Sequence, residues 1–447
     1  MSVSFAPVRV DGRDAACSDD PTAVEAGPTG AGTPSPRSAG GPRITVLVPA
    51  HDEGDRIVAT LSGLRSQTLP AIRTIVIADN CSDDTVELAL AAGAEVLQTV
   101  GNRDKKAGAL NQAWASRFRR SGSGDRRGRD RRGADRRVTS SGPHGRPEQR
   151  IGSRRAAVSL RRLGADRRAA DLGLTDAADD DLVLVQDADS TLDAGFLEAA
   201  ARHVLADDRM GAVGGTFRGD PGGGLVGHLQ RNEYARYGRD VRRLKGKCLV
   251  VTGTAAMFRA ATLRHISAAR LAGRLPRGDG HGGIYDTTVL TEDNELTFAI
   301  LHLGYRVLSP KECTLSTEVM PTWRTLWHQR LRWKRGAIEN CVQYGVTGIT
   351  WRYWGRQLLT LAGLLVTFLY LGSVIASLVS AGSLHFQPFW LAVTGVFVLE
   401  RVITLQDRGW GRALAAGTMY ELLYDLFLQA VHARAYLDAA LRRERRW

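Results

Sequence analysis

Two alternating patterns of apolar positions run along the first third of the chain. Short β-branched runs at residues 44–48 and 74–78 are typical of buried parallel strands. The segment between them carries apolar residues at the spacing of one helix face, and the alternation continues through residues 85–98. We therefore expect an open α/β sheet, mostly parallel, with flanking helices. Ligands of such sheets lie at the carboxyl ends of the strands.

The pattern stops over residues 118–176 and resumes with an apolar strand at 181–186. Between Arg119 and Asp171 there are 17 arginines and 6 acidic residues, so this segment accounts for most of the net charge of +13. Its low apolar content predicts a disordered insertion, and residues 1–43 predict a disordered tail for the same reason. The insertion could grip a polyanion or be a solvated loop. We expect no specific nucleic-acid partner, because arginine-rich loops attract polyanions in any case.

A third pattern begins after residue 340. Residues 358–379 are apolar and uncharged over a length that spans a bilayer, and residues 389–405 form a second candidate span or a buried core helix. Residues 414–437 place acidic and polar side chains on one helix face, so this segment could lie in the membrane interface or pack on other helices. Basic residues flank these segments, which predicts a multi-pass membrane region, 341–447, with the catalytic domain, 44–340, in the cytoplasm.

Carboxylates follow two of the predicted strands. Asp79 ends one strand and could contact a base or ribose, while the residues after it could cap the next helix. Asp187 and Asp189 directly follow the strand at 181–186. Two adjacent carboxylates are costly without a cation, and oxygen ligands suit Mg²⁺ or Mn²⁺ carrying a diphosphate. A plain loop is the alternative.

Two further groups of side chains suit the same chemistry. Thr291, Glu292 and Asp293 open a predicted helix, where they could cap it or supply a general base. Tryptophan and basic residues gather within residues 323–335, just before the apolar segments. They could bind diphosphate and stack on a sugar, or form an aromatic and basic belt at a membrane surface.

The five cysteines are scattered without a CxxC pair, which favours a reducing compartment over a disulfide framework or a structural zinc site. No apolar run typical of a signal peptide occurs in residues 1–43.

Six motifs in this order resemble the processive branch of the family 2 glycosyltransferases, which includes cellulose, chitin, hyaluronan and poly-N-acetylglucosamine synthases. The matching segments are Val48-Pro49-Ala50-His51-Asp52-Glu53, Asp79 with Ser82 and Asp83, Lys106-Ala107-Gly108-Ala109-Leu110-Asn111, Asp187-Ala188-Asp189, Thr291-Glu292-Asp293 and Gln329-Arg330-Leu331-Arg332-Trp333.

The resemblance implies a GT-A-like nucleotide-sugar-binding fold and an inverting, single-displacement transfer from a UDP-sugar, with N-acetylglucosamine favoured by the resemblance. It implies Asp293 as the catalytic base and Asp189 as the metal ligand. The donor would contact Asp52, Glu53, Asp79, Lys106, Asp187, Gln329 and Arg332. The acceptor would contact Trp333, Glu292 and Gly253, the last following a strand predicted over residues 248–252. A carbohydrate or lipid-linked acceptor is expected, with membrane lipids as further partners.

Two departures from the family pattern affect the expected product. The arginine-rich insertion separates two motifs, and no transmembrane segment precedes the catalytic domain in this sequence. Polysaccharide synthesis is therefore weighed against the addition of a single sugar to a lipid or small acceptor, and a partner membrane subunit could supply missing helices. A further alternative is a nucleic-acid-binding or membrane-scaffold protein with a decayed enzyme domain, although the acidic and QxxRW positions are all present.

Overall fold

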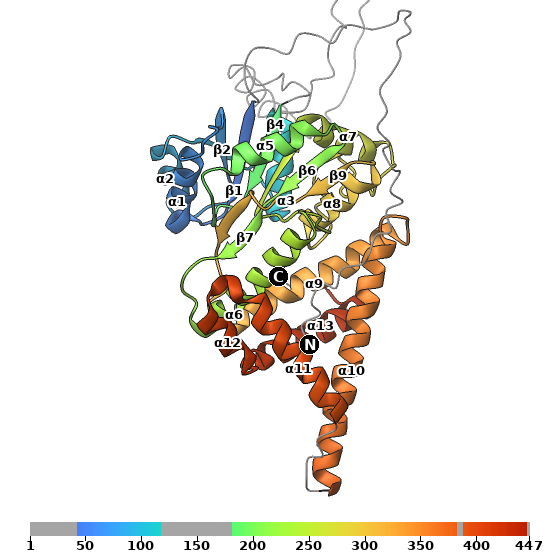
Figure 1. Cartoon of the computed structure of the whole chain (residues 1–447). Helices are drawn as coiled ribbons and strands as arrows, with labels where there is room; N and C mark the ends of the chain where they lie inside the picture. Colours follow the sequence, from blue (N-terminus) through green and yellow to red (C-terminus); the bar gives the residue numbers. More distant parts are fainter. Residues whose placement is uncertain (1–42, 118–180, 382–387, 445–447) are drawn as a thin grey trace, which may run out of the picture.

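The computed structural model describes residues 43–117, 181–381 and 388–444, which form an α/β domain followed by a group of helices (Figure 1). The predicted tail, apart from Arg43, lies outside the described residues, and so does the whole of the predicted insertion, 118–176. The segment missing between Arg117 and Asp181 joins the end of a helix to the start of a strand. Both attachment points lie at the amino edge of the sheet described below.

A seven-stranded sheet forms the centre of the α/β domain. Its strands, in spatial order, are β3 (Glu95–Gln98), β2 (Arg73–Ala78), β1 (Ile44–Ala50), β4 (Leu182–Gln186), β8 (Ala255–Arg259), β6 (Met210–Gly214) and β9 (Arg306–Leu308). β1 pairs in parallel with both β2 and β4, as the apolar runs predict.

β8 runs antiparallel to both of its neighbours, so the sheet is mixed rather than purely parallel. The chain enters β8 from the carboxyl edge of β4, where the amide of Asp187 donates to the Thr254 carbonyl at 3.0 Å. A strand that starts at this edge can only run back toward the amino edge. The strand predicted over residues 248–252 is wrong, because these residues pair with no strand of the sheet. These residues form an irregular segment in which Val251 is buried and its amide donates to Thr297 Oγ1.

Helices cover both faces of the sheet, because successive strand residues point to opposite sides. On β1, Val46 and Val48 belong to one core cluster and Leu47 belongs to the other. The first cluster packs α1 (Gly54–Arg65), α2 (Thr85–Ala91) and α5 (Phe196–Ala206) on the sheet. The second packs α3 (Lys105–Arg117), α7 (Ala260–Leu271) and α8 (Glu292–His302) on the other face.

A small three-stranded sheet lies beside the main one, in the order β5 (Ser190–Leu192), β10 (Thr314–Thr317) and β7 (Thr216–Gly219). α6 (Gly224–Arg243) follows β7 and packs on it. Stacking of Phe217 on Tyr237, with ring centroids 5.5 Å apart, fixes this contact. The small sheet therefore extends the domain from the carboxyl edge of β4 toward the C-terminal helices.

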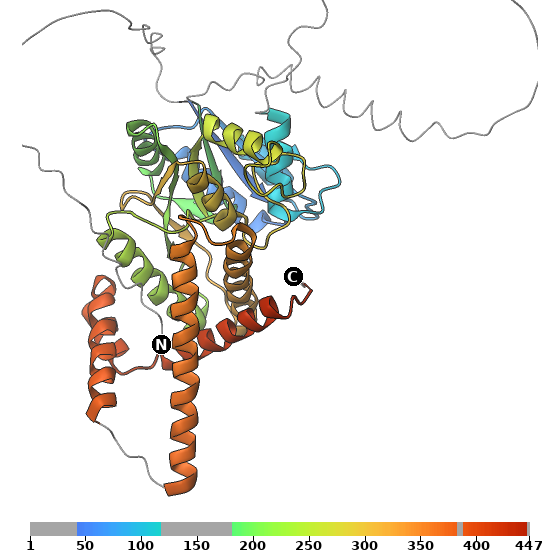
Figure 2. The ribbon, with the colours of Figure 1, turned by 90° about the vertical axis from the view of Figure 1, so that its right-hand side faces the viewer.

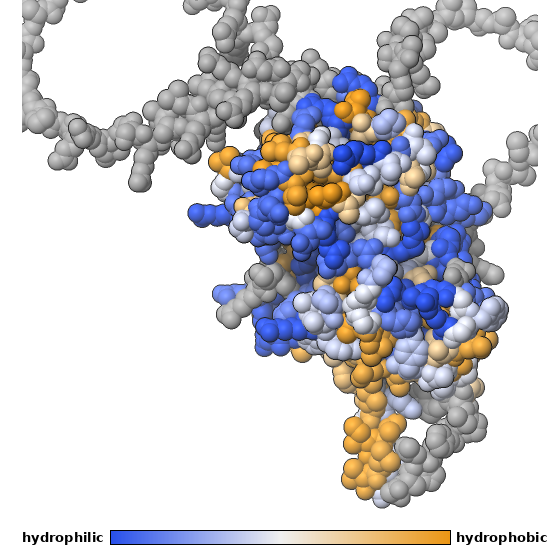
Figure 3. Space-filling model, turned by 90° about the vertical axis from the view of Figure 1, so that its left-hand side faces the viewer, coloured by the Kyte–Doolittle hydropathy of each residue, from blue (hydrophilic) through white to orange (hydrophobic). Residues whose placement is uncertain are grey.

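The C-terminal helices begin with α9 (Trp323–Tyr344) and α10 (Trp351–Ala381). α10 projects away from the rest of the molecule (Figures 1 and 2), and its far end forms an apolar surface (Figure 3). Among the described helices it alone is long and apolar enough to cross a membrane, over Trp351–Ser380, and its most apolar 18-residue stretch has a mean hydropathy of 2.2. The second predicted span is α11 (Pro388–Thr404), whose 17 residues are at the short end of the roughly 17–25 that cross a bilayer, so a second span stays a prediction.

The last predicted segment, 414–437, is divided between two helices, α12 (Trp410–Gly417) and α13 (Leu422–Ala440). Of the two arrangements that its polar face allows, packing on other helices is the one observed, since α13 lies against α9. The buried Arg401 of α11 pairs with both Glu421 and Asp425, and Arg236 of α6 donates to Glu421 at 2.7 Å. The charges that interrupt the apolar pattern here thus pair with one another.

A second buried ion pair supports the start of α8. Arg270 and Glu295 are 1% and 0% exposed and lie 2.5 Å apart, and the Tyr344 hydroxyl donates to the same carboxylate at 2.6 Å. Thr291, the residue just before the start of α8, accepts a hydrogen bond from Asn340 of α9 at 3.1 Å. The first turn of α8 is therefore fixed from below by α7 and α9.

Replacing Glu295 with Gln should destabilise the protein by about 3–5 kcal/mol, because it leaves the buried Arg270 without its counter-charge. Thermal unfolding followed by circular dichroism in detergent would measure the loss. The exposed pair Arg218–Asp193 supplies the control, since R218Q should cost only about 0–1 kcal/mol. Equal melting temperatures for E295Q and R218Q would contradict the structural role given to Glu295.

Candidate active site

Three strand ends meet at one edge of the main sheet. β1 pairs in parallel with β2 and β4, so the residues that follow these strands come together at the carboxyl edge. Asp79 follows β2, and Asp187 and Asp189 follow β4. The predicted convergence of acidic side chains at this edge is therefore present in the fold.

Lys106, in the first turn of α3, lies among these acids. Its ammonium pairs with Asp187, donates to the Gly253 carbonyl at 3.0 Å and lies 3.7 Å from Glu292 Oε1. Burial disfavours the charge on Lys106, but Asp187 and Glu292 hold its pKa above the ordinary value. Burial also raises the pKa of Asp187 to about 6, with Lys106 opposing the rise and Asp189 adding to it.

Asp187 and Asp189 fit the donor set that a divalent cation prefers, since they offer carboxylate oxygens at the mouth of one cavity. The second carboxylate accepts a hydrogen bond from Ser190 Oγ at 2.9 Å, which orients it. Ser190 in turn bonds Thr317 of β10 at 3.0 Å. The small sheet thus holds the second aspartate in place.

Asp293 lies in the first turn of α8, across the cavity from these acids. Its Oδ2 accepts from the Gly253 amide at 3.0 Å, and its Oδ1 accepts from its neighbour's amide at 2.7 Å. Burial and the nearby Glu292 raise the pKa of Asp293 to about 6, against the effect of Lys106. The carboxylate is thus oriented by two amides and is basic enough to take a proton near neutral pH.

Gly253 holds both sides of this arrangement together, because its amide bonds Asp293 and its carbonyl bonds Lys106. A Cβ added here would lie 3.2 Å from the Lys106 ammonium and 3.4 Å from the Asp293 carboxylate. Glycine therefore permits the close approach. This residue, predicted to touch the acceptor, lines the cavity but also positions Asp293 and Lys106.

α9 forms the facing wall of the cavity, which has a volume of about 660 Å³. Gln329, Arg332 and Trp333 line it, as their i, i+3, i+4 spacing predicts. Within the described residues, Arg332 has no carboxylate at ion-pair distance, and the buried Oε1 of Gln329 has no hydrogen-bond partner. The Arg332 guanidinium and the side-chain oxygen of Gln329 therefore face the acidic side of the cavity.

Nine of the twelve predicted site residues line this cavity. They are Lys106, Asp187, Asp189, Gly253, Glu292, Asp293, Gln329, Arg332 and Trp333. The other three, all expected to touch the nucleotide, lie outside its lining. Asp79 is 7% exposed and accepts hydrogen bonds from Thr99 at 2.7 Å and Asn102 at 2.8 Å. These bonds give the Asp79 carboxylate a structural role. Its contact with a nucleotide base stays a prediction.

Asp52 and Glu53 follow β1. Burial, together with the charges of Asp189 and Glu318, raises the pKa of Glu53 to about 7, so this side chain belongs electrostatically to the acidic side of the cavity. Asp52 instead accepts from the amide of Ser82 at 2.6 Å, which ties the loop after β1 to the loop after β2.

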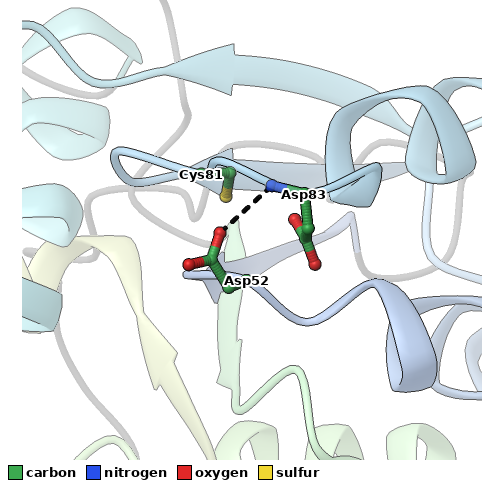
Figure 4. A group of neighbouring side chains, drawn as sticks. All are labelled: Asp52, Cys81 and Asp83. Carbon is green, nitrogen blue, oxygen red and sulfur yellow. Dashed lines mark hydrogen bonds between the residues drawn. The ribbon is translucent and has the colours of Figure 1, made fainter.

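Asp52 also belongs to a cluster with Cys81 and Asp83 whose ligand atoms lie within 4.8 Å of one another (Figure 4). The two carboxylates of this cluster are already engaged with the backbone. Asp52 accepts from the amide of Asp83, and Asp83 accepts from the Gly54 amide at 2.8 Å. These bonds make the cluster a clasp between two loops.

The sequence reasoning missed several side chains of the cavity wall. Phe217, Tyr234 and Met320 come from β7, α6 and the segment before α9, and residues 287–290 come from the loop before α8. A lone aromatic residue on a helix gives no signal of function. The run Arg231-Asn232-Glu233-Tyr234 in α6 gives one clue, because it places several polar side chains directly before a tyrosine.

Comparison with known proteins agrees with this geometry. The model described as "Glycosyl transferase family 2" matches residues 45–116, and the model "Glycosyl transferase family group 2" matches residues 182–403. The gap between the two matches coincides with the arginine-rich segment. That this segment is an insertion into a family domain stays a prediction.

Curated relatives cover shorter parts of the chain. A probable glycosyltransferase of Bacillus subtilis, YdaM, is 29% identical over 157 residues, 35% of this chain and 34% of that protein. Poly-beta-1,6-N-acetyl-D-glucosamine synthase of Staphylococcus aureus is 25% identical over 162 residues, 36% of this chain and 35% of that protein. The matches thus span about a third of the length of these relatives.

Among solved structures, a mannosyltransferase of Pyrobaculum calidifontis, in complex with GDP-Man and Mn²⁺, matches with a TM-score of 0.53. The match covers 92% of this chain and 90% of that chain at 17% identity, so it concerns the fold alone. The GT-A-like fold, the two family matches and the motifs around one cavity lead to the same conclusion: the chain belongs to the family 2 glycosyltransferases.

Proposed function

We propose that this enzyme transfers N-acetylglucosamine from a UDP-sugar to an acceptor hydroxyl, with inversion, at the cytoplasmic face of a membrane and in the synthesis of a polysaccharide. The observation that carries the proposal is that three kinds of functional side chain line one cavity. A carboxylate pair, an aspartate oriented by two amides, and an arginine that has no carboxylate at ion-pair distance among the described residues all line it. The choice of sugar rests on the similarity to poly-beta-1,6-N-acetyl-D-glucosamine synthase.

The donor diphosphate would lie between Asp189 and Arg332. A divalent cation held by Asp189, with Asp187 beside it, would supply positive charge against the diphosphate. Arg332 adds a second positive group with bidentate hydrogen-bonding geometry. Both features stabilise negative charge that develops as the bond between the sugar and the diphosphate breaks.

Asp293 would act as the base. It takes the proton of the acceptor hydroxyl while that oxygen attacks the anomeric carbon from the face opposite the departing nucleotide. The bonds from Gly253 and the helix amide hold the carboxylate still, which favours a single reactive orientation. Trp333, 36% exposed, offers a ring on which an acceptor sugar can stack, and the buried Tyr234 completes the wall beside it.

Membrane attachment would come from α10, which exposes apolar side chains along its length from Leu358 to Val379. A helix of this kind is stable in lipid and costly to expose to water. α9 lies directly before it in the chain, so the acceptor wall of the cavity would be close to the membrane surface. α11 would lie beside the bilayer or partly within it, with or without a partner membrane subunit.

A donor screen on the purified full-length protein tests the proposal. UDP-N-acetylglucosamine, UDP-glucose and GDP-mannose would be compared by release of the nucleoside diphosphate with Mg²⁺ or Mn²⁺, and radiolabelled products would be sized. We expect the first donor to be preferred and products of many sugars to form. Preference for GDP-mannose would overturn the donor assignment, and a product with one added sugar would replace polymer synthesis by single transfer.

The metal assignment predicts a contrast between two sites. D189N should lower the apparent affinity for Mn²⁺ by about 10-fold or more, because a hard anionic ligand is lost. C81S, in the clasp of Asp52 and Asp83, should leave that affinity unchanged. Titration of activity with Mn²⁺ after chelation measures both. A loss in C81S with normal D189N behaviour would place the cation at the clasp instead.

The base assignment predicts that D293N abolishes transfer and keeps UDP binding, since only proton acceptance is removed. D279N is a matched control, because Asp279 is an exposed aspartate outside the cavity whose side chain bonds the His281 amide. UDP affinity by calorimetry and turnover by UDP release separate the two effects. Turnover of D293N near the wild-type rate would remove Asp293 from this role.

The same assignment fixes the direction of the pH profile. The base works only when ionised, and the pKa of Asp293 is raised to about 6. Activity should therefore be lost as the pH falls through about 6 and should be flat just above it. A profile that keeps full activity at pH 5 would contradict a base with this pKa.

A further inference from the structure

Arg330 lies in the middle of the Gln329–Trp333 motif but does not line the cavity. It is 6% exposed, and its guanidinium lies 4.4 Å from the ring centroid of Trp333 and 5.6 Å from that of Tyr234. Both rings belong to the cavity wall. The buried cation therefore contacts two aromatic side chains of the cavity wall, of which Trp333 is 36% exposed and Tyr234 is buried.

Glu233 of α6 fixes the position of this guanidinium. Its Oε2 accepts from Arg330 Nη2 at 2.7 Å and from the Tyr424 hydroxyl at 2.5 Å. Tyr424 belongs to α13 and is 1% exposed. One carboxylate oxygen thus joins α6, α9 and α13 directly behind the cavity wall.

The Trp333 ring depends on this support. Its side chain is 36% exposed, and within the described parts of the chain its indole makes no hydrogen bond. The contact with the Arg330 guanidinium is a cation–π interaction, worth about 0.5–2 kcal/mol depending on desolvation. A planar guanidinium can lie against two rings while bonding a carboxylate, which a lysine ammonium cannot reproduce.

We propose that Arg330 is a positioning residue for acceptor binding. It fixes the Trp333 and Tyr234 rings in the cavity wall, and α13 sets its position through Tyr424 and Glu233. The proposal rests on the proposed function in one respect, because it takes the Trp333 ring as the acceptor platform. The alternative is that the ion pair only stabilises the packing of three helices.

The chain offers a matched control on the same helix. Arg335 is also buried, at 3% exposure, and pairs with Glu339 at 2.6 Å and with the Arg443 carbonyl, away from the cavity lining. R330K and R335K therefore make the same chemical change in two buried arginines of α9. Only the first change removes a contact with the cavity aromatics.

The first experiment needs no substrate. The full-length protein would be labelled with 5-fluorotryptophan, and the Trp333 resonance assigned by its loss in W333F. We expect R330K to shift this ¹⁹F resonance and R335K to leave it in place. An unmoved resonance in R330K would overturn the proposal. If R330K does not fold, Y424F carries the test, since it removes one hydroxyl and should shift the same resonance, and an unmoved resonance would again overturn the proposal.

The second experiment uses UDP-N-acetylglucosamine and a β-1,6-linked N-acetylglucosamine oligosaccharide as the acceptor probe. R330K should raise the acceptor KM about 10-fold with little change in the donor KM, as expected from the loss of a ring contact of this size. Y424F should move the acceptor KM in the same direction, and R335K should not move it. Equal acceptor KM values for R330K and R335K would overturn the proposal.

The two experiments separate failures of the two proposals. If the wild-type protein turns over no donor, the proposed function fails, and the ¹⁹F measurement still decides whether Arg330 positions Trp333. If the wild-type protein transfers sugar and R330K matches R335K in both measurements, the proposed function stands and the positioning role of Arg330 is wrong.

Discussion

The neutralisation of crowded carboxylates constrains the centre of this molecule. Asp187, Asp189, Glu292 and Asp293 approach one another from β4 and α8, and acidic groups this close repel unless a cation separates them. Lys106 supplies that charge by contacting Asp187, Glu292 and the Gly253 carbonyl at once. Without it the start of α8 and the end of β4 could not share one cavity. Three further features help to bring these carboxylates close together. They are Gly253, the antiparallel strand β8 that follows it, and the buried pair of Arg270 and Glu295 at the start of α8.

Periodicity was sufficient to predict the strands β1, β2 and β4 and the convergence of their ends. Each is a short apolar run followed by a polar residue, so local pattern and global position agree. The antiparallel direction of β8 could not be read in this way, because it depends on where the preceding loop crosses the sheet. The apolar residues 248–252 were misleading for the same reason, as they pack under α8 without strand pairing.

The candidate site shows a similar division. Gln329, Arg332 and Trp333 follow from helical spacing, and Asp187 and Asp189 from their place after a strand. Tyr234 and Phe217 were missed, since they reach the cavity only through the packing of α6 on the small sheet. The acidic residues of α13 were seen as one polar face, but their partners Arg401 and Arg236 lie on separate helices and could not be paired from sequence.

The arginine-rich segment joins Arg117 to Asp181, and both of these residues lie at the sheet edge opposite the catalytic cavity. α3 has Lys106 at its cavity end and Arg117 at its far end. β4 starts at that far edge and ends at Gln186, just before Asp187. The two attachment points therefore lie a helix length and a strand length away from Lys106 and Asp187. A change at either point can reach these two side chains along the chain only through α3 or β4.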